Sequence, residues 1–515
     1  MNGGAGGHSR WLRAPGWGRS GLLAVLLLAA APAAAQQLRI GLNSDPDALD
    51  PTTSRTVAGR VVFTALCDKL IDLDANLDLV PQLATAWAWS EDGKALTLTL
   101  RQGVKFHDGE TLDAAAVKYT IERSLTLPGS TRKSELGPVT GVEIVDTLTA
   151  RIVLSAPFAP LAAQLADRAG MIVSPKAAVA AGGDFSKHPV CAGPYRFVER
   201  VAQDRIVLGR FADYWDAGAY HFDRVTYLPI PDASVRIANL RSGGIDIAET
   251  LLPSDVAAIT ADAKLSVMTG PSLAAVYLAI NVGHGERAKT PLGQNAKLRE
   301  ALELAIDRTI LNAVAFDGQF VPGNQTVPPG SRWYVKSLPV PGRDLARARA
   351  LIREAGLERL RVRLTVPNTT TYLQSAQVLQ SMVAEAGIDF DLAVTEVTTA
   401  LSQWTAGDFE ALLILWSGRV DPDGNLYTFN ACDGALNGGS YCNPAVDRLL
   451  TEARTHIDFA TRMGAYEQAA RIYLAERPYI YLWHPALIYG VSRRLDGFRL
   501  VPDGMIRLGG LKARG

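Results

Sequence analysis

The chain has 515 residues, of which 48% are hydrophobic and 20% are charged, and its 52 Lys and Arg residues balance its 52 Asp and Glu residues. This length exceeds one ordinary domain, so two or three domains are expected, and the composition excludes a disordered chain. The balanced charge gives no support for nucleic acid or an anionic membrane as a partner.

The N-terminus has the order of a secretory signal. Three arginines precede an apolar run over residues 22–31, and the small residues 32–35 follow. The apolar run is about half as long as the ~20 residues needed to span a bilayer. We therefore expect residues 1–35 to be a signal peptide that is cleaved near Ala35 and directs the protein to the periplasm; a short membrane anchor is the alternative.

Strands and helices are expected in alternation after this segment. The run 38–42 is strand-like, and two Asp-Pro pairs after it mark turns. A helical pattern covers about 56–66, and the period-2 alternation of residues 95–100 predicts a half-buried strand. Asp113 is expected to cap a helix over 112–125.

The rest of the chain repeats this mixture without a fixed period or an internal repeat. Strand-like runs cover 205–208, 224–228, 276–281, 360–366, 412–416 and 479–483, and helical patterns cover 234–240, 297–312, 372–385, 446–454 and 460–476. The pattern predicts α/β or mixed α+β lobes, without by itself placing the boundary between them.

The four cysteines form an even number, which allows disulfides in an oxidising compartment. Cys432 and Cys442 are separated by a glycine-rich loop, whose flexibility lets their Cα atoms approach to the bridging distance of ~5.5 Å. We predict a disulfide between them, with two free thiols as the alternative. Cys67 and Cys191 are the remaining candidates for a second pair.

The sequence lacks the local signatures of common catalytic sites. It has no Gly-x-Ser-x-Gly elbow, no His-Glu-x-x-His pair and no phosphate-binding Gly-x-x-x-x-Gly-Lys-Ser/Thr loop. The histidines after residue 35 show no metal-ligand spacing; they are His107, His188, His221, His284, His456 and His484. We expect no metal site, no cofactor and no enzyme activity, although catalytic triads need not be local in sequence.

Recognition chemistry follows the apolar run 412–416, because strand ends form ligand clefts in α/β lobes. Trp416 can stack on an organic group, and Arg419 can bind a carboxylate through two parallel hydrogen bonds. Asp421 lies in the turn that follows. The alternative is a solvated turn in which Arg419 pairs with Asp421 or Asp423.

Several sequence blocks are specific enough to be compared with known families. The most specific block runs from Leu83 through Gly93 to Leu100–Gly109. Further blocks are Ala192–Phe197 with Tyr214-Trp215, Leu298–Ala301 with Ala305–Arg308, Val327–Pro329 and Tyr481–His484. In these blocks the chain resembles the family 5 extracellular solute-binding proteins, which are the dipeptide-, oligopeptide- and nickel-binding components of ABC importers. The resemblance covers nearly the whole chain. It implies that the segment around His107 shapes a lobe and is not a ligand site.

The resemblance implies a two-lobed α/β fold of the periplasmic binding protein type, with an extra subdomain on the larger lobe (cluster C type). Lobe I would comprise residues 36–271 and 481–515, with the subdomain at about 75–195, and lobe II residues 272–480. The crossings between the lobes would form a hinge, and the lobes would close on the ligand.

The function implied by the resemblance is that of a periplasmic substrate-binding component. It would capture a small organic solute, either a short peptide or a carboxylate-bearing compound, and deliver it to the permease and ATPase of an ABC importer at the inner membrane. We expect a monomer with no nucleic-acid partner. A periplasmic hydrolase of such compounds and a nickel or metallophore carrier are the alternatives.

In the peptide-binding members of the family, an acidic residue just after the tryptophan that corresponds to Trp416 holds the peptide's amino group. Here Arg419 stands in that loop, which favours an anionic ligand group and argues against a free dipeptide, although Asp421 remains a candidate. The predicted ligand-binding residues are Trp416, Arg419, Asp421, Trp483 and His484. Tyr277 and Asn281 are predicted to lie near the hinge.

Overall fold

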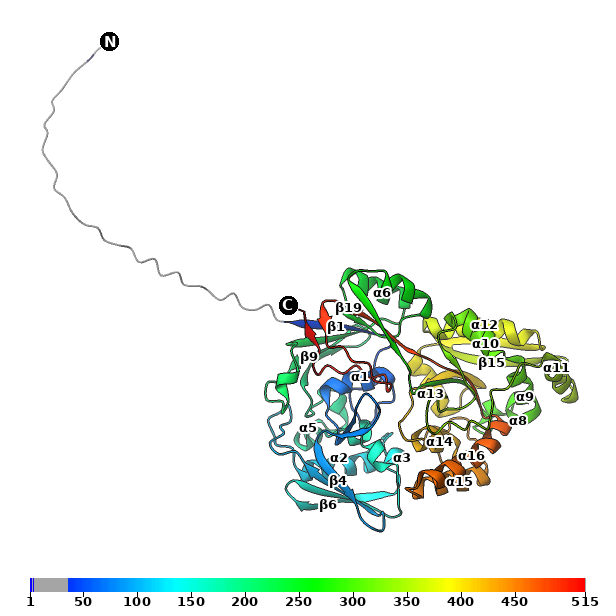
Figure 1. Cartoon of the computed structure of the whole chain (residues 1–515), viewed down its shortest axis with the longest axis horizontal. Coiled ribbons are helices and arrows are strands. Elements are labelled where there is room, and N and C mark those ends of the chain that lie inside the picture. Colours follow the sequence, from blue (N-terminus) through cyan, green and yellow to red (C-terminus); the bar gives the residue numbers. More distant parts are fainter. Residues whose placement is uncertain (2, 4–35, 515) are drawn as a thin grey trace. The chain divides into compact units, whose positions relative to one another are not determined.

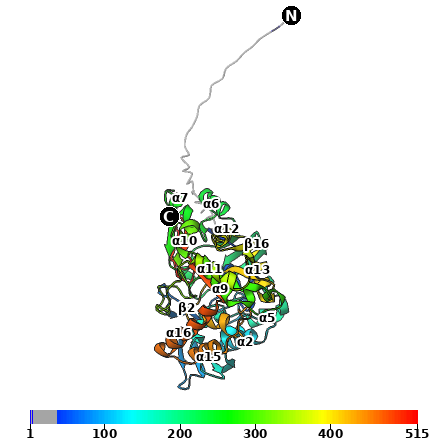
Figure 2. The same ribbon diagram turned by 90° about the vertical axis from the view of Figure 1, so that its right-hand side faces the viewer.

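Two large β-sheets organise the part of the chain that the computed structural model describes, which is residues 1, 3 and 36–514 (Figure 1). The predicted signal peptide, apart from positions 1 and 3, and its cleavage near Ala35 lie outside the described residues. Figures 1 and 2 place helix α6 (Ala233–Ser242) and helix α15 (Pro444–Thr455) at opposite ends of the unit that begins at Gln36.

The first sheet has seven strands in the order β12-β19-β11-β1-β10-β9-β8. Their bounds are β1 (Gln37–Leu42), β8 (Tyr195–Val201), β9 (Arg205–Arg210), β10 (Arg224–Pro229), β11 (Ile247–Ala248), β12 (Leu265–Gly270) and β19 (Leu487–Ser492). Strand β1 runs parallel to β10 and β11 in the middle of the sheet, and its apolar side chains are buried. Because β19 comes from near the C-terminus, both ends of the described chain build this sheet.

The second sheet has six strands in the order β14-β18-β13-β17-β15-β16. Their bounds are β13 (Ala275–Ile280), β14 (Val321–Pro322), β15 (Leu360–Pro367), β16 (Ile388–Thr395), β17 (Ala411–Trp416) and β18 (Tyr479–His484). Strands β13 and β18 are buried along their whole length, which explains why their sequences are continuous apolar runs.

A third sheet, with the order β4-β5-β7-β6, is antiparallel and has a hydrophobic cluster of its own. Its strands are β4 (Ala84–Trp89), β5 (Ala95–Leu100), β6 (Val139–Asp146) and β7 (Thr149–Leu154). The cluster draws on residues from Leu70 to Ala192, the region for which a subdomain is predicted. Two-stranded pairs complete the sheets, namely β2 (Ile71–Leu73) with β3 (Leu79–Pro81) and β20 (Leu495–Asp496) with β21 (Lys512–Ala513).

Helices join these strands. Those before residue 271 are α1 (Val57–Leu66), α2 (Ala114–Thr126), α3 (Lys133–Leu136), α4 (Leu161–Gln164), α5 (Pro175–Ala181), α6 and α7 (Val256–Thr260). Those after it are α8 (Pro291–Gln294), α9 (Ala296–Ala305), α10 (Arg308–Phe316), α11 (Leu345–Glu354), α12 (Thr370–Ala384), α13 (Val397–Ala406), α14 (Asp423–Asn430), α15 and α16 (Phe459–Glu476). The 3-10 turns are η1 (Arg168–Gly170), η2 (Gly182–Lys187), η3 (Ala217–Ala219), η4 (Pro253–Asp255) and η5 (Glu286–Ala288).

One predicted helix is two helices in the structure. The pattern over 297–312 predicts continuous helix, but α9 ends at Ala305 and α10 begins at Arg308. Ile306 is extended, and the Asp307 carboxylate accepts hydrogen bonds from the backbone N–H groups of Thr309 and Ile310, both at 2.9 Å. An N-capping aspartate inside the apolar pattern therefore starts a new helix. The predicted cap at Asp113 is confirmed, because its side chain accepts from the Ala116 N–H.

The chain crosses between the two large sheets at two neighbouring places. The first crossing lies between β12 and β13, and the second at Pro485-Ala486 between β18 and β19. The Ser272 hydroxyl donates a hydrogen bond to the Pro485 carbonyl and so links the crossings. The predicted return at Tyr481 is therefore placed too early, because β18 pairs with the second sheet through His484.

Both disulfides considered from the sequence are present. Cys432 pairs with Cys442, and Cys67 pairs with Cys191 across a sequence separation of 124 residues. Among the described residues, no helix is long and apolar enough to span a membrane.

Candidate functional site

Three neighbouring cavities, which share some of their lining residues, are lined by residues from both large sheets and their loops. The central cavity, of about 210 Å³, is lined by Glu249 on the side of the first sheet and by Leu415 on the side of the second. The arginine cavity, of about 320 Å³, shares Arg55 with it. The large cavity, of about 950 Å³, shares Ser272, Pro485, Ala486 and Pro502 with the central cavity.

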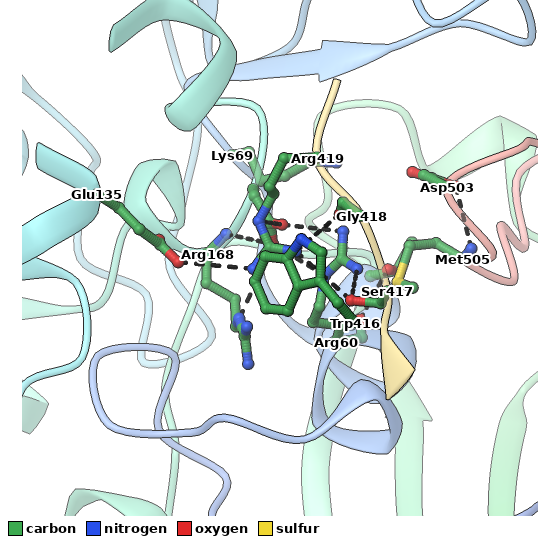
Figure 3. Close-up of polar contacts among 12 residues, drawn as sticks. Arg60, Lys69, Glu135, Arg168, Trp416, Ser417, Gly418, Arg419, Asp503 and Met505 are labelled. Atoms are coloured by element: carbon green, nitrogen blue, oxygen red, sulfur yellow. Dashed lines mark hydrogen bonds and ion pairs between the residues drawn. The ribbon is translucent and has the colours of Figure 1, made fainter. Parts of the chain in front are cut away.

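A cluster of buried charges lies at the arginine cavity. Its members are Arg60, Arg132, Arg168, Arg419, Glu135 and Asp167, none of which is more than 7% exposed. Figure 3 shows four of these members, namely Arg60, Glu135, Arg168 and Arg419. Arg419 comes from the loop after β17, and the other five come from the chain before residue 170. We refer to these six residues as the arginine cluster.

Two carboxylates connect the arginines of this cluster. Asp167 lies 3.0 Å from Arg419 Nε and 2.9 Å from Arg60 Nη2. Glu135 accepts two hydrogen bonds from Arg132, at 2.7 and 2.8 Å, and lies 3.5 Å from Arg419 Nη2. The pair formed by Arg419 and Asp167 therefore joins the loop after the second sheet to the region before the first crossing.

Local sequence features set the positions of these side chains. Asp167 accepts a hydrogen bond from the Arg168 N–H at the start of η1, which fixes its carboxylate beside the cluster. The Arg419 N–H donates to Asn425 Oδ1 at 2.7 Å, and Asn425 Nδ2 donates back to the Arg419 carbonyl at 2.8 Å. Gly418 adopts φ +79°, and a Cβ atom there would lie 2.2 Å from the Leu273 carbonyl oxygen, so only glycine fits.

The arginine cluster carries more positive than negative charge. Four guanidinium groups face two carboxylates, which leaves two positive charges in excess. Burial lowers the pKa of Arg168 and of Arg419, while at Asp167 the charges of Arg419, Arg60 and Arg168 outweigh burial and hold the pKa well below its usual range. Uncompensated buried charge is costly, and an anion would compensate it.

Several residues that line this cavity have buried polar atoms that make no hydrogen bond in the described part of the chain. Arg419 Nη2, Arg168 Nε and both polar atoms of the Gln164 side chain make no hydrogen bond within the described residues. Gln164 is 1% exposed and lines the arginine cavity together with Arg168 and Arg419. Arg55, which lines both this cavity and the central one, donates to Thr405 Oγ1 at 2.6 Å. Arg168 Nε, Arg419 Nη2 and Gln164 Nε2 are therefore the donors near this cavity that lack a hydrogen bond within the described residues.

The structure brings two of the predicted site residues together. Trp416 and Arg419 both line the arginine cavity, and the Arg419 guanidinium lies 4.4 Å from the centre of the Trp416 ring. The Trp416 Nε1–H donates to Asn425 Oδ1, so the same amide orients both residues. Arg419 pairs with neither Asp421 nor Asp423, which are bound to Arg462 and Arg454, respectively. The alternative of a solvated turn is therefore wrong.

Asp421 and His484 lie instead at the large cavity. Asp421 accepts two hydrogen bonds from Arg462, at 2.6 and 2.9 Å, so the positive charge of Arg462 balances its negative charge. His484 Nδ1 lies 2.9 Å from the Ala274 carbonyl, and its Nε2 has no partner among the described residues. Burial lowers the pKa of His484 to about 4, so its ring is neutral at pH 7.

Three predicted residues lie away from the cavities. Trp483 is 2% exposed and packs against Phe316 in the core of the second sheet. Tyr277 packs among aromatic side chains, and Asn281 donates hydrogen bonds to the carbonyls of His284, Gly407 and Phe409. Because alternate residues of a strand point to opposite faces, nearness in sequence to a crossing does not bring a side chain to the cleft.

Sequence reasoning missed most of the arginine cluster. Long stretches of chain separate Arg60, Arg132 and Arg168, and no recognisable motif surrounds any of them. The one local signal is the i,i+3 spacing of Arg132 and Glu135, which is common on exposed helices. Only the tertiary fold makes these charges neighbours.

Comparison with known proteins places the chain among binding proteins. The profile of the bacterial extracellular solute-binding proteins, family 5 (middle region), matches residues 78–437. A glutathione-binding protein of Pectobacterium atrosepticum is 30% identical over 512 residues, covering 96% of each chain.

Solved structures show the same two-lobed fold. A dipeptide-binding protein of Pseudoalteromonas sp. SM9913, in complex with Met-Leu, has a TM-score of 0.86 at 23% identity and covers 93% of this chain and 100% of that one. The PBP AgaA of A. tumefaciens R10, in complex with agropinic acid, has a TM-score of 0.85 at 25% identity and covers 93% of this chain and 99% of that one.

Proposed function

Because this chain belongs to the family 5 bacterial extracellular solute-binding proteins, we propose that it captures a small anionic organic solute between its two lobes and delivers it to an ABC importer. Members of this family bind peptides or small ligands and work with ABC transporter permeases. The arginine cluster is the observation that supports an anionic ligand, because it holds two excess positive charges and unpartnered donors on residues that line a cavity.

The ligand class is a carboxylate-bearing compound or a short acidic peptide. Arg419 Nη2, which makes no hydrogen bond within the described residues, supplies a donor for a carboxylate, and the Trp416 ring supplies apolar surface for an organic group. Glutathione, which the relatives at 30% identity are named for binding, carries two carboxylates and fits this class. A neutral dipeptide fits less well, because the loop after Trp416 reads Ser417-Gly418-Arg419 and has no acid directly after Trp416 to hold the amino group.

Lobe closure supplies the binding step in this proposal. Lobe I comprises residues 36–271 with 485–515, and lobe II residues 272–484. The two crossings, linked by Ser272 and Pro485, act as the hinge. Closure brings Arg419 against Asp167 and Glu135, so the ligand's anion and the lobe contact form in one step.

The setting of this function follows from the predicted secretory signal. The mature protein acts in the periplasm as a monomer, after cleavage near Ala35, and docks to a permease with its ATPase at the inner membrane. It performs no chemistry on the ligand. Among the described residues, no group of three His, Cys, Asp or Glu side chains is placed to hold a metal ion.

Native mass spectrometry of the mature protein, purified directly from its expression host, tests this proposal. A co-purified small molecule with at least one anionic group is the expected result. An empty protein that also gives no thermal shift with a broad panel of carboxylates and peptides would refute it. Turnover of the bound compound would favour the hydrolase, and stoichiometric metal with chelator-sensitive affinity would favour the metal carrier.

A further inference from the structure

Buried acidic side chains in the described part of the chain nearly all have an arginine partner. Nine Asp and Glu residues are classed as buried. The seven that pair with arginine are Asp50, Glu135, Asp167, Asp246, Glu303, Asp423 and Asp503. This pairing is what burial of a charge requires. The exceptions are Asp68 and Glu249.

The two exceptions differ in how their carboxylates are satisfied. Asp68 accepts hydrogen bonds from three neutral side chains, namely Tyr214 Oη at 2.9 Å, Trp215 Nε1 at 2.8 Å and Gln82 Nε2 at 3.1 Å. The Glu249 carboxylate accepts a single hydrogen bond, from the Asn43 N–H at 3.1 Å. Glu249 is therefore the least satisfied buried carboxylate among the described residues.

The neighbouring arginine does not neutralise Glu249. Arg236 donates from Nε to the backbone carbonyl of Glu249 at 2.8 Å and from Nη2 to the carbonyl of Thr250 at 2.7 Å. Its Nη1 donates to the carbonyls of Ile230 and Pro231. No ion pair joins Arg236 to the Glu249 carboxylate within the described residues. The guanidinium group of Arg236 instead binds backbone carbonyl oxygens.

Glu249 lies where a ligand would meet it. It directly follows β11 in the first sheet, is 4% exposed and lines the central cavity. Arg55 also lines this cavity, and it lines the arginine cavity as well. Burial raises the pKa of Glu249 and outweighs the opposing effects of the Asn43 hydrogen bond and of the nearby charge of Arg236. The arginine cavity thus has an excess of positive charge among its surrounding residues, and the neighbouring central cavity has a carboxylate without an ion-pair partner among the described residues.

We propose that Glu249 binds a cationic group of the ligand, an ammonium group in the first instance, while the arginine cluster binds the ligand's anionic end. The ligand is then zwitterionic, with its amino group held by the first lobe and not by the loop after Trp416. This assignment rests on the proposed function and adds the second charged group and its position.

Matched ligands that differ only in one charge test the assignment. The probes are glutathione, the dipeptide Ala-Glu, the N-acetyl derivative of each, and glutarate, which has carboxylates but no amine. Affinities are measured by calorimetry for the wild-type protein and for Glu249→Gln. We expect the wild type to prefer each free amine to its N-acetyl derivative by roughly 10- to 100-fold, and the variant to lose this preference.

Two controls separate recognition from folding. Asp68→Asn removes the other buried carboxylate without arginine, which lies outside the cavities described above, and should leave the preference for the free amine intact. Glu249→Gln should melt no lower than wild type at pH 8, because it removes an unpaired buried charge. Glu249→Asp keeps the charge on a shorter side chain and should retain part of the preference.

Each outcome decides between the proposals. Equal affinity for the free and acetylated amines, or a preference that survives in Glu249→Gln, overturns the role of Glu249 while the binding function stands. A co-purified molecule without a cationic group has the same meaning. A protein that carries no small molecule and binds none of the probes refutes the proposed function itself.

Discussion

Replacing Arg419 by alanine tests the ligand site directly, because the structure predicts different effects on affinity and on stability. The change removes one of four guanidinium groups from the arginine cluster and leaves both acids with a partner. Asp167 keeps Arg60, at 2.9 Å from Nη2, and Glu135 keeps its two hydrogen bonds from Arg132.

The expected cost to folding is therefore small. Breaking a buried ion pair usually costs about 3–5 kcal/mol, because one charge is left alone. Here no acid is left alone and the excess positive charge falls, so we expect the free energy of unfolding to drop by less than about 2 kcal/mol. The expected cost to binding is larger, about 2–5 kcal/mol for the loss of a buried charge partner of the ligand, which is roughly 30- to 4,000-fold in affinity.

Isothermal titration calorimetry with the ligand identified by native mass spectrometry measures the affinity, and urea unfolding at pH 7 measures the stability. Arg359→Gln is the control, because Arg359 pairs with Asp389 on the exposed surface and should change neither quantity. An Arg419→Ala protein that binds within twofold of wild type would show that Arg419 only joins the two lobes, and the reasoning from excess charge would fail.

Three further predictions concern acid stability, covalent links and the binding loop. Because burial lowers the pKa of His484 to about 4, the stability gained from its neutral ring is present above pH 6.5 and is lost as the pH falls towards 4. His484→Gln should therefore reduce the loss of stability between pH 7 and 4.5, measured by urea unfolding, by up to about 3 kcal/mol. A variant that loses as much stability as the wild type over this pH range would contradict the prediction. Replacing both Cys67 and Cys191 by alanine should lower the free energy of unfolding by about 5 kcal/mol, given their separation of 124 residues, and a loss below 1 kcal/mol in urea would count against it. Gly418→Ala should weaken ligand binding at least tenfold by calorimetry, because its Cβ would lie 2.2 Å from the Leu273 carbonyl oxygen; wild-type affinity would show that the loop can shift freely.

The sequence predicted the fold better than the site, and particular elements show why. Alternating or continuous apolar runs are physical requirements of half-buried and buried strands, so 95–100 and 412–416 were identifiable from local pattern alone. The break at Asp307 was missed because an aspartate on the polar side of a helix and an N-capping aspartate look alike in sequence. Only the backbone shows which one is present.

Of the candidate site, the sequence predicts only the loop after a buried strand, whose Trp416 and Arg419 line one cavity in the structure. The residues that complete it, such as Arg168 and Asp167, come from distant segments and carry no local mark. Glu249 is likewise not predicted from the sequence, because only the three-dimensional structure shows that its buried carboxylate makes no ion pair within the described residues. Trp483 was predicted because it lies next to a crossing, yet its strand turns the indole into the core. Burial and charge balance identify such site residues only when their neighbours in the folded structure are known.

The division of the arginine cluster between the two lobes has an energetic consequence for transport. Arg419 belongs to one lobe and the other three arginines to the opposite one, so closing the protein without a ligand gathers four cations around two anions. Water screens these charges when the lobes are apart. If the ligand is anionic as proposed, the excess positive charge would offset part of the attraction between Arg419 and Asp167 in an empty closed form, and the bound solute would remove that excess. Electrostatic repulsion would then act as the gate that keeps a vacant receptor from engaging its permease and triggering a futile transport cycle.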